Sequence, residues 1–142
     1  MPQVKRSWAT LRVIGDDLDP TEITALLGCE PTSKQIKGET IIGKSTDLAR
    51  TASFGRWSLK AAAREPEDLD GQITELLSNT TSDLKIWKSI ADRYRLELFC
   101  GIFLSGSNEG LSISPSALAS LGLRHIELGL DIYEGDRPGS EA

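Results

Sequence analysis

The chain has very little of the residue types on which most enzyme chemistry depends. Its 142 residues include one histidine, His125, and two cysteines, Cys29 and Cys100, which lie far apart in the sequence. Nucleophilic catalysis by a serine or a cysteine needs a histidine within reach, and a structural zinc site needs four close ligands. We therefore expect no catalytic residues, no bound metal and no cofactor, with His125 as a solvated residue within a strand.

Long hydrophobic runs and excess positive charge are also missing. No apolar run approaches the roughly 20 residues that span a bilayer, and the first residues lack the apolar centre of a signal peptide. We therefore expect a cytoplasmic protein whose cysteines are reduced. The formal net charge of -5 disfavours binding to nucleic acid, which needs lysine and arginine at the phosphates. It likewise disfavours binding to anionic membranes.

Two stretches of the sequence echo each other, 7–31 and 98–122. Each has an apolar strand pattern, a turn with glycine, an Asp-Pro or Ser-Pro helix start and a short helix that ends at Leu-Gly. In the first copy, Asp19 has the character of an N-cap, Glu22 fits a capping box and Gly28 stops the helix. The echo predicts that one strand–helix unit is used twice in one domain, 1–142, with its core at about 7–133.

Alternating and helical patterns predict the remaining elements. We expect strands at 8–14, 56–61, 95–104 and 124–133, a short strand at 110–113, and helices at 20–27, 67–78, 82–93 and 115–121. Residues 33–55 read as a long loop, and 134–142 as a polar tail. This order is typical of an α+β fold, ferredoxin-like, with two strand–helix–strand units on one mainly antiparallel sheet and helices on one face.

The segment Gly38–Ser45 matches the phosphate-loop pattern G-x-x-x-x-G-K-[ST], with Gly38, Gly43, Lys44 and Ser45 at its defined positions. In such a loop, backbone amides hold phosphate oxygens and the lysine reaches the terminal phosphates. The motif also requires a buried strand before it and a helix after it. The polar residues that precede Gly38 do not fit that strand, so the favoured interpretation is a chance match in a loop.

Large aromatic side chains and charges alternate onto the sheet face that the helices leave open. The candidates for contact with a partner are Trp8, Arg12, Phe99, Phe103, Glu127, Asp131 and Tyr133. Aromatic residues and arginine are enriched at the centres of protein interfaces. Because monomers rarely expose large apolar patches, either the 33–55 loop covers this face or a partner or second copy does.

The sequence resembles a known family along most of its length. The run from Arg12 to Thr32, RVIGDDLDPTEITALLGCEPT, carries the resemblance together with the later pieces KGE, WSL, LG and DIY. It resembles the family called domain of unknown function forty-two seventy-nine, from about residue 7 to 133. The resemblance implies a bacterial origin and a small stand-alone domain, and it implies no activity or cofactor. It includes Lys37, Gly38 and Glu39 but not the Gly43–Ser45 end of the phosphate-loop match.

Two hypotheses for the function follow. The first is a non-enzymatic cytosolic module that binds a protein, of the kind that neutralises a toxin or effector, with an acidic charge that suits a basic partner. The alternative is a regulator that binds a small molecule or a nucleotide phosphate through the Gly38–Ser45 loop. An enzyme would need carboxylates such as Glu39, Glu127 and Asp131 to converge, and no pattern in the sequence requires this.

Overall fold

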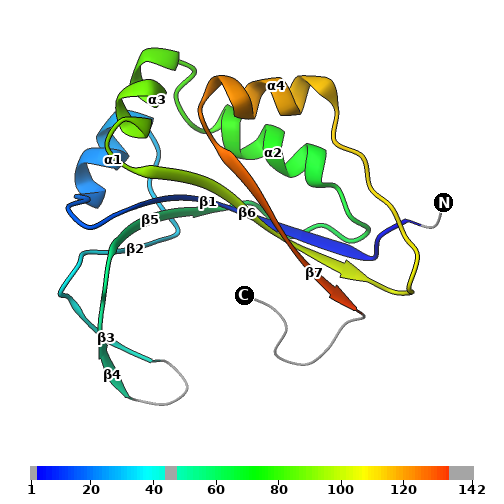
Figure 1. The fold of residues 1–142 in the computed structure, drawn as a ribbon, viewed down its shortest axis with the longest axis horizontal. Coiled ribbons are helices and arrows are strands. Elements are labelled where there is room, and N and C mark those ends of the chain that lie inside the picture. Colours follow the sequence, from blue (N-terminus) through cyan, green and yellow to red (C-terminus); the bar gives the residue numbers. More distant parts are fainter. Residues whose placement is uncertain (1–2, 44–47, 135–142) are drawn as a thin grey trace.

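The computed structural model describes residues 3–43 and 48–134. They form two layers, a five-stranded sheet and a layer of four helices on one of its faces (Figure 1). In chain order the elements are β1 (Arg6–Gly15), α1 (Pro20–Leu27), β2 (Ser33–Gln35), β3 (Thr40–Ile42), β4 (Ala49–Thr51), β5 (Gly55–Lys60), α2 (Leu69–Ser78), α3 (Leu84–Ala91), β6 (Arg95–Leu104), α4 (Pro115–Leu123) and β7 (Glu127–Glu134). None of the described helices is long and apolar enough to cross a membrane.

The strand order in the sheet is β2-β5-β1-β6-β7. The pairs β2–β5, β5–β1 and β1–β6 are antiparallel, and β6–β7 is parallel. This confirms an α+β fold with a mainly antiparallel sheet and helices on one face. The ferredoxin-like topology is not confirmed, because the two strand–helix–strand units differ. The strands on either side of α4 are parallel neighbours, whereas the chain between α1 and β5 passes through three further strands and returns antiparallel to β1.

The hydrophobic core lies between the sheet and the helices. Alternation along β1 and β6 places Leu11 and Leu98 in this core, each 1% exposed. Leu128 packs against the same core from β7. The helices contribute fully buried side chains such as Ile23 and Trp87. This layer orders the backbone of β1, β5 and β6 and thereby fixes which side chains appear on their other face.

Helix α1 begins and ends where the sequence predicts. The Oδ1 atom of Asp19 accepts a hydrogen bond of 3.0 Å from the backbone N–H of Thr21, and Gly28 takes the left-handed conformation at φ 74° that ends many helices. The predicted capping box is not formed, because the carboxylate of Glu22 pairs instead with Arg93, at 3.0 Å. A cation from the connection between α3 and β6 thus replaces the local backbone amide as the partner of Glu22.

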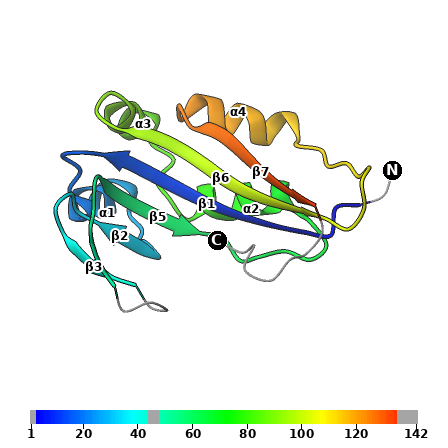
Figure 2. The same ribbon diagram turned by 60° about the horizontal axis from the view of Figure 1, so that its bottom comes forward.

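The segment 33–55 is not the loop that the sequence predicts. It adds β2 to the sheet edge and then forms a two-stranded hairpin, β3–β4, which stands away from the sheet (Figures 1 and 2). Every described side chain of β4 is exposed, and Ile42 on β3 is 66% exposed. A segment that covered the second sheet face would bury such side chains, so the described part of the hairpin does not serve as that cover.

Three smaller predictions also need correction. The short strand predicted at 110–113 is reduced to an isolated bridge between Gln3 and Gly110. His125 does not lie within a strand but in the turn before β7, with φ 59°, where its N–H donates to the carbonyl of Gly122. Of the predicted polar tail, only Glu134 is described, at the end of β7, and 135–142 lie outside the described residues.

Candidate functional site

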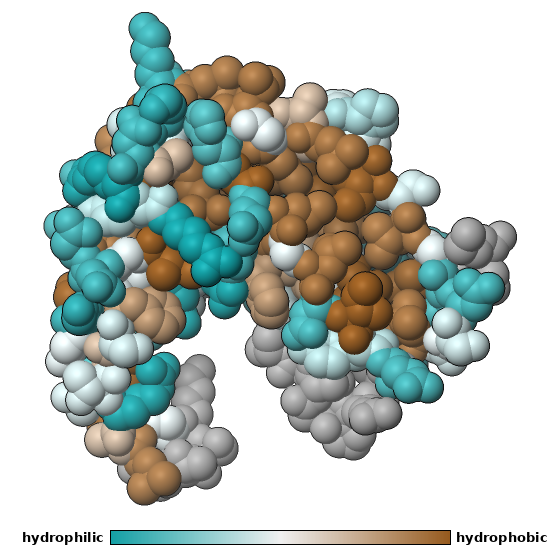
Figure 3. Space-filling model, viewed as in Figure 1, coloured by the Kyte–Doolittle hydropathy of each residue, from teal (hydrophilic) through white to brown (hydrophobic). Residues whose placement is uncertain are grey.

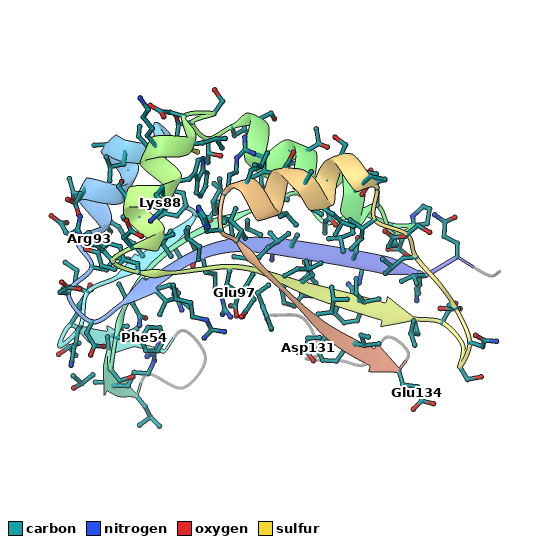
Figure 4. All side chains as sticks on the ribbon, turned by 45° about the horizontal axis from the view of Figure 1, so that its top comes forward. Phe54, Lys88, Arg93, Glu97, Asp131 and Glu134 are labelled. Carbon is teal, nitrogen blue, oxygen red and sulfur yellow. The ribbon has the colours of Figure 1, made fainter. Side chains whose placement is uncertain are left out.

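The strand registers place the predicted partner-binding residues together on the sheet face opposite the helices, here called the open face. Trp8 lies beside Gly101, which in turn lies beside Asp131, and Phe103 lies beside Tyr133. Arg12 lies beside Glu97, which in turn lies beside Glu127. Figure 4 shows Glu97 and Asp131 on the side of the sheet away from the helices. The predicted residues therefore share one face, but the contacts described below divide it into two ends.

The end near Phe103 is closed by contacts within the chain. Phe103 is 0% exposed, its ring stacks on Tyr133 with the centroids 4.7 Å apart, and the guanidinium of Arg6 lies 4.2 Å from its centroid. The Tyr133 hydroxyl donates a hydrogen bond of 2.6 Å to Asp131, which raises the pKa of Tyr133. This end offers a partner little free aromatic surface.

Trp8 is the floor of the middle of the open face. Its ring is tilted against Phe99 with the centroids 5.3 Å apart, and it is only 4% exposed. Its indole also lies against Gly101, where a Cβ would stand 2.2 Å from the ring. Glycine at 101 therefore makes room for the tryptophan. The buried Nε1 of Trp8 has no hydrogen-bond partner in the described part of the chain.

A network of ion pairs links β1, β6 and β7 on the open face, beside Trp8. Glu97, whose side chain is 8% exposed, pairs with Arg12 from β1 and with Arg95 from its own strand. Arg95 also donates to Glu127 on β7, at 2.9 Å. The guanidinium of Arg12 lies 4.4 Å from the centroid of the Phe99 ring. Arg12 is therefore held in place by an anion on one side and an aromatic ring on another.

Between Arg12 and the edge strand β2, the open face contains a hollow of about 220 Å³, here called the basic pocket. It is lined by Trp8, Thr10, Arg12, Thr32, Ser33, Arg56, Ser58, Lys60 and Phe99. The lining has three cationic side chains, several hydroxyl groups, two aromatic rings and no carboxylate. Rigid strands supply most of these residues, and the Thr32 hydroxyl is fixed between the Ser58 carbonyl and the Lys60 amide.

Arg56 is a partly buried cation of the basic pocket. Partial burial lowers its pKa, and the nearby positive charges of Arg12 and Arg50 lower it further. Its buried Nε atom has no hydrogen-bond partner among the residues described. A guanidinium that is removed from water beside other cations is unfavourable until an anion joins it. The pocket is thus suited to a carboxylate or phosphate with a flat group against Trp8 and Phe99.

Gly38 and Gly43 of the phosphate-loop match do not line this pocket. Gly38, at φ 90°, turns the chain before β3, and the N–H of Gly43 donates to the carbonyl of Leu48 to close the hairpin. Lys44 and Ser45 lie outside the described residues. The described part of the motif is a strand of a hairpin, which lacks the loop and following helix that hold phosphates.

The carboxylates considered for enzyme chemistry have separate partners. Glu39 accepts a hydrogen bond from the N–H of Ile36, whereas Glu127 and Asp131 bond to Arg95 and Tyr133. Across residues 3–43 and 48–134, no three His, Cys, Asp or Glu side chains gather as a possible metal site. The buried thiol of Cys100 has its pKa raised to about 12 by burial, so it is a poor nucleophile in the folded protein.

The sequence analysis did not identify the residues that β5 contributes to the basic pocket. Arg56, Ser58 and Lys60 alternate along β5 with the core residues Trp57 and Leu59. The predicted strand at 56–61 already implied this alternation, so the same pattern would have placed them on the open face beside Arg12. What the sequence does not show is that β5 is the neighbour of β1.

The comparisons with known proteins place the chain in a family. The family profile described as Domain of unknown function (DUF4279) matches residues 2–135. The chain belongs to this family. This confirms the resemblance seen in the sequence, and it assigns no activity to the DUF4279 domain. No curated protein and no solved structure matches the chain significantly.

Proposed function

We propose that this DUF4279 domain is a non-enzymatic cytosolic module that binds a partner protein through an acidic anchor group seated in the basic pocket. The observation that carries the proposal is Arg56, a partly buried guanidinium whose nearby charges are cationic. A carboxylate from the partner would supply the missing counter-charge and hydrogen-bond acceptor. Charge-assisted hydrogen bonds of this kind contribute about 1.5–3 kcal/mol each.

The size of the pocket favours an anchor group over a whole small molecule. Its volume of about 220 Å³ lies below the roughly 300–1,000 Å³ that is usual for small-molecule sites. It is large enough for one side chain or a chain terminus, and interface anchors typically fill pockets of this kind. Trp8 and Phe99 provide an aromatic floor for the apolar part of such an anchor.

The charge of the pocket changes the kind of partner that we expect. The net charge of -5 suggests a basic partner, but the basic pocket has three cations in its lining. Local charge decides which group is recognised, whereas net charge acts mainly on the rate of encounter. The proposed partner therefore presents an acidic anchor.

The two free thiols, Cys29 and Cys100, suit a reducing compartment such as the cytosol.

A matched pair of probes tests the anchor. N-acetylphenylalanine carries a carboxylate beside an aromatic ring, and N-acetylphenylalaninamide is the same molecule without the charge. We expect the carboxylate to shift backbone amide resonances of β1 and β5 in an NMR titration, and the amide to bind at least about tenfold more weakly, the ratio that corresponds to 1.4 kcal/mol. Added salt should weaken binding of the carboxylate.

Two variants with the same change of charge locate the site. Arg56→Gln should weaken binding of the carboxylate by about ten- to a hundredfold, whereas Lys85→Gln, on an exposed position of α3, should leave it unchanged. Equal binding of the two probes, or an unaffected Arg56→Gln, would show that the pocket is not an anion site. A longer peptide that ends in phenylalanine should bind more tightly than the single residue. Equal affinity would instead indicate a small-molecule ligand.

A further inference from the structure

The outer edge of β7 is open to another strand. β7 is the last strand in the sheet order, and within the described part of the chain only β6 pairs with it. Its outward N–H and C=O groups therefore lack a strand partner there. Natural proteins usually protect such edges with charged or proline residues, because an exposed edge pairs readily with other strands.

An apolar groove runs along this edge on the helix side. It has a volume of about 520 Å³, and its lining includes Ile102, Leu111, Ile113, Leu118, Leu130 and Ile132. Leu130 is 44% exposed and Ile132 60% exposed. In Figure 3, apolar residues gather over α4 and β7, while polar residues gather over the opposite end of the molecule.

Two of the three acidic residues of β7 do not protect this side. Glu127 and Asp131 alternate onto the open face, whereas Leu128, Leu130 and Ile132 alternate onto the groove side. The groove side of the strand is therefore aliphatic from Leu128 to Ile132, and Glu134 follows at the end of the strand. A strand that fits here must supply backbone groups to the edge and aliphatic side chains at alternate positions. β7 itself has this pattern.

We propose that two copies of this protein pair through antiparallel β7 strands, with the two-fold axis at Leu130. The charges on β7 select this register. An axis at Asp131 would place Asp131 opposite its own copy, and an axis at Gly129 would place Glu127 opposite Asp131. Like charges directly opposite each other destabilise a sheet.

An axis at Leu130 avoids both conflicts. It places Leu128 of each copy opposite Ile132 of the other, on the groove side, and Gly129 opposite Asp131 on the open face. Axes further along the strand, at Leu128 or Ile132, leave fewer residues of β7 paired. The resulting ten-stranded sheet keeps the helices of both copies on one side, where Leu118 of each α4 covers the groove. This inference rests on the sheet edge and is independent of the basic pocket.

Sedimentation of the full chain in the analytical ultracentrifuge tests the pairing. We expect a dimer for the wild type. Leu130→Lys should give a monomer of unchanged helix and strand content, because a charge at the axis meets its own copy in the seam. The matched control is Ile42→Lys, which adds the same charge at a residue that is 66% exposed on β3, and it should remain a dimer. A monomeric wild type would overturn the proposal, as would a dimeric, folded Leu130→Lys.

Crosslinking tests the register even if Leu130→Lys fails to fold. In a Cys29→Ser background, Leu130→Cys places two thiols opposite each other, where antiparallel Cα atoms are about 4.5–5.5 Å apart. This separation suits a disulfide, so mild oxidation should give a covalent dimer. Ile132→Cys lies on the same side, but its two copies would be about 13 Å apart, so it should remain uncrosslinked. Crosslinking of Ile132→Cys without Leu130→Cys would reject the proposed register.

Discussion

Arg12 on β1 donates hydrogen bonds from both Nε and Nη2 to the same oxygen atom, Oε1 of Glu97 on β6. The two residues are 85 positions apart in the sequence. The pair joins the two central strands on the open face, and the same guanidinium lines the basic pocket. The residue that would meet an anionic ligand is therefore oriented by a contact that also stabilises the sheet.

Replacement of Arg12 tests this double role. Arg12→Met should lower the free energy of unfolding by about 1.5–3 kcal/mol, because Glu97 is left with only part of its hydrogen bonding in a position that is 8% exposed. Arg93→Met is a matched control, since Arg93 and Glu22 are 48% and 39% exposed; its effect on stability should be clearly smaller, because water screens an exposed ion pair. Urea denaturation measures both. Equal effects of the two substitutions would mean that burial of Glu97 does not matter.

Substitution of Phe103 tests whether this end of the open face is covered by the chain itself or by a partner. Because Phe103 is 0% exposed under Arg6 and against Tyr133, Phe103→Asp should unfold or strongly destabilise the isolated chain. Phe103→Ala should lower its free energy of unfolding by about 3–5 kcal/mol. Thermal melting followed by circular dichroism checks this. A stable Phe103→Asp variant that has only lost association would move this end of the open face into an interface.

The cap of α1 predicts a smaller loss of stability. Asp19→Ala should lower the free energy of unfolding by about 1 kcal/mol, because the first turn loses the acceptor for the N–H of Thr21. Asp17→Ala, in the exposed turn just before, should change it by less than about 0.5 kcal/mol. The measurement is the midpoint of urea denaturation. A wild-type midpoint for Asp19→Ala would show that the cap contributes nothing to stability.

Stability should fall at alkaline pH because of Cys100. Burial raises the pKa of its thiol from 9.0 to about 12, so the unfolded chain loses this proton at a lower pH than the folded protein does. The contribution of the protonated Cys100 thiol to the free energy of unfolding is fully present below pH 9.0 and is lost as the pH rises through about 12. Each pH unit in this range should remove about 1.4 kcal/mol.

The matched variant for this pH effect is Cys100→Ala. Urea denaturation at pH 9 and pH 10 should show a smaller decrease for Cys100→Ala than for the wild type, although the variant is less stable at both. Identical pH dependence of the wild type and Cys100→Ala would remove Cys100 as the cause.

Thiol reactivity gives a second check on burial. The half-buried thiol of Cys29 should react with a thiol reagent in the folded protein, whereas Cys100, which is 0% exposed, should not.

Local sequence determined the elements that depend on nearest neighbours. The alternation at 95–104 predicts β6 at the bounds that the structure has, and Asp19, Pro20 and Gly28 mark both ends of α1. The alternation of Trp8, Arg12, Phe99 and Tyr133 against the core positions also predicts the open face. Capping and burial of alternate side chains act over a few residues, so they can be read from the chain alone.

Tertiary structure alone decided how these elements combine. The segment 33–55 has no clear hydrophobic period, so its pairing as β2 and as the β3–β4 hairpin depends on backbone hydrogen bonds that no side-chain pattern marks. The basic pocket requires β5 to lie beside β1, which brings Arg56 and Lys60 next to Arg12. The free edge and apolar groove of β7 likewise follow from its place at the end of the sheet. Strand order is set by the packing of the whole chain against its helices, and packing between distant residues leaves no local sign in the sequence.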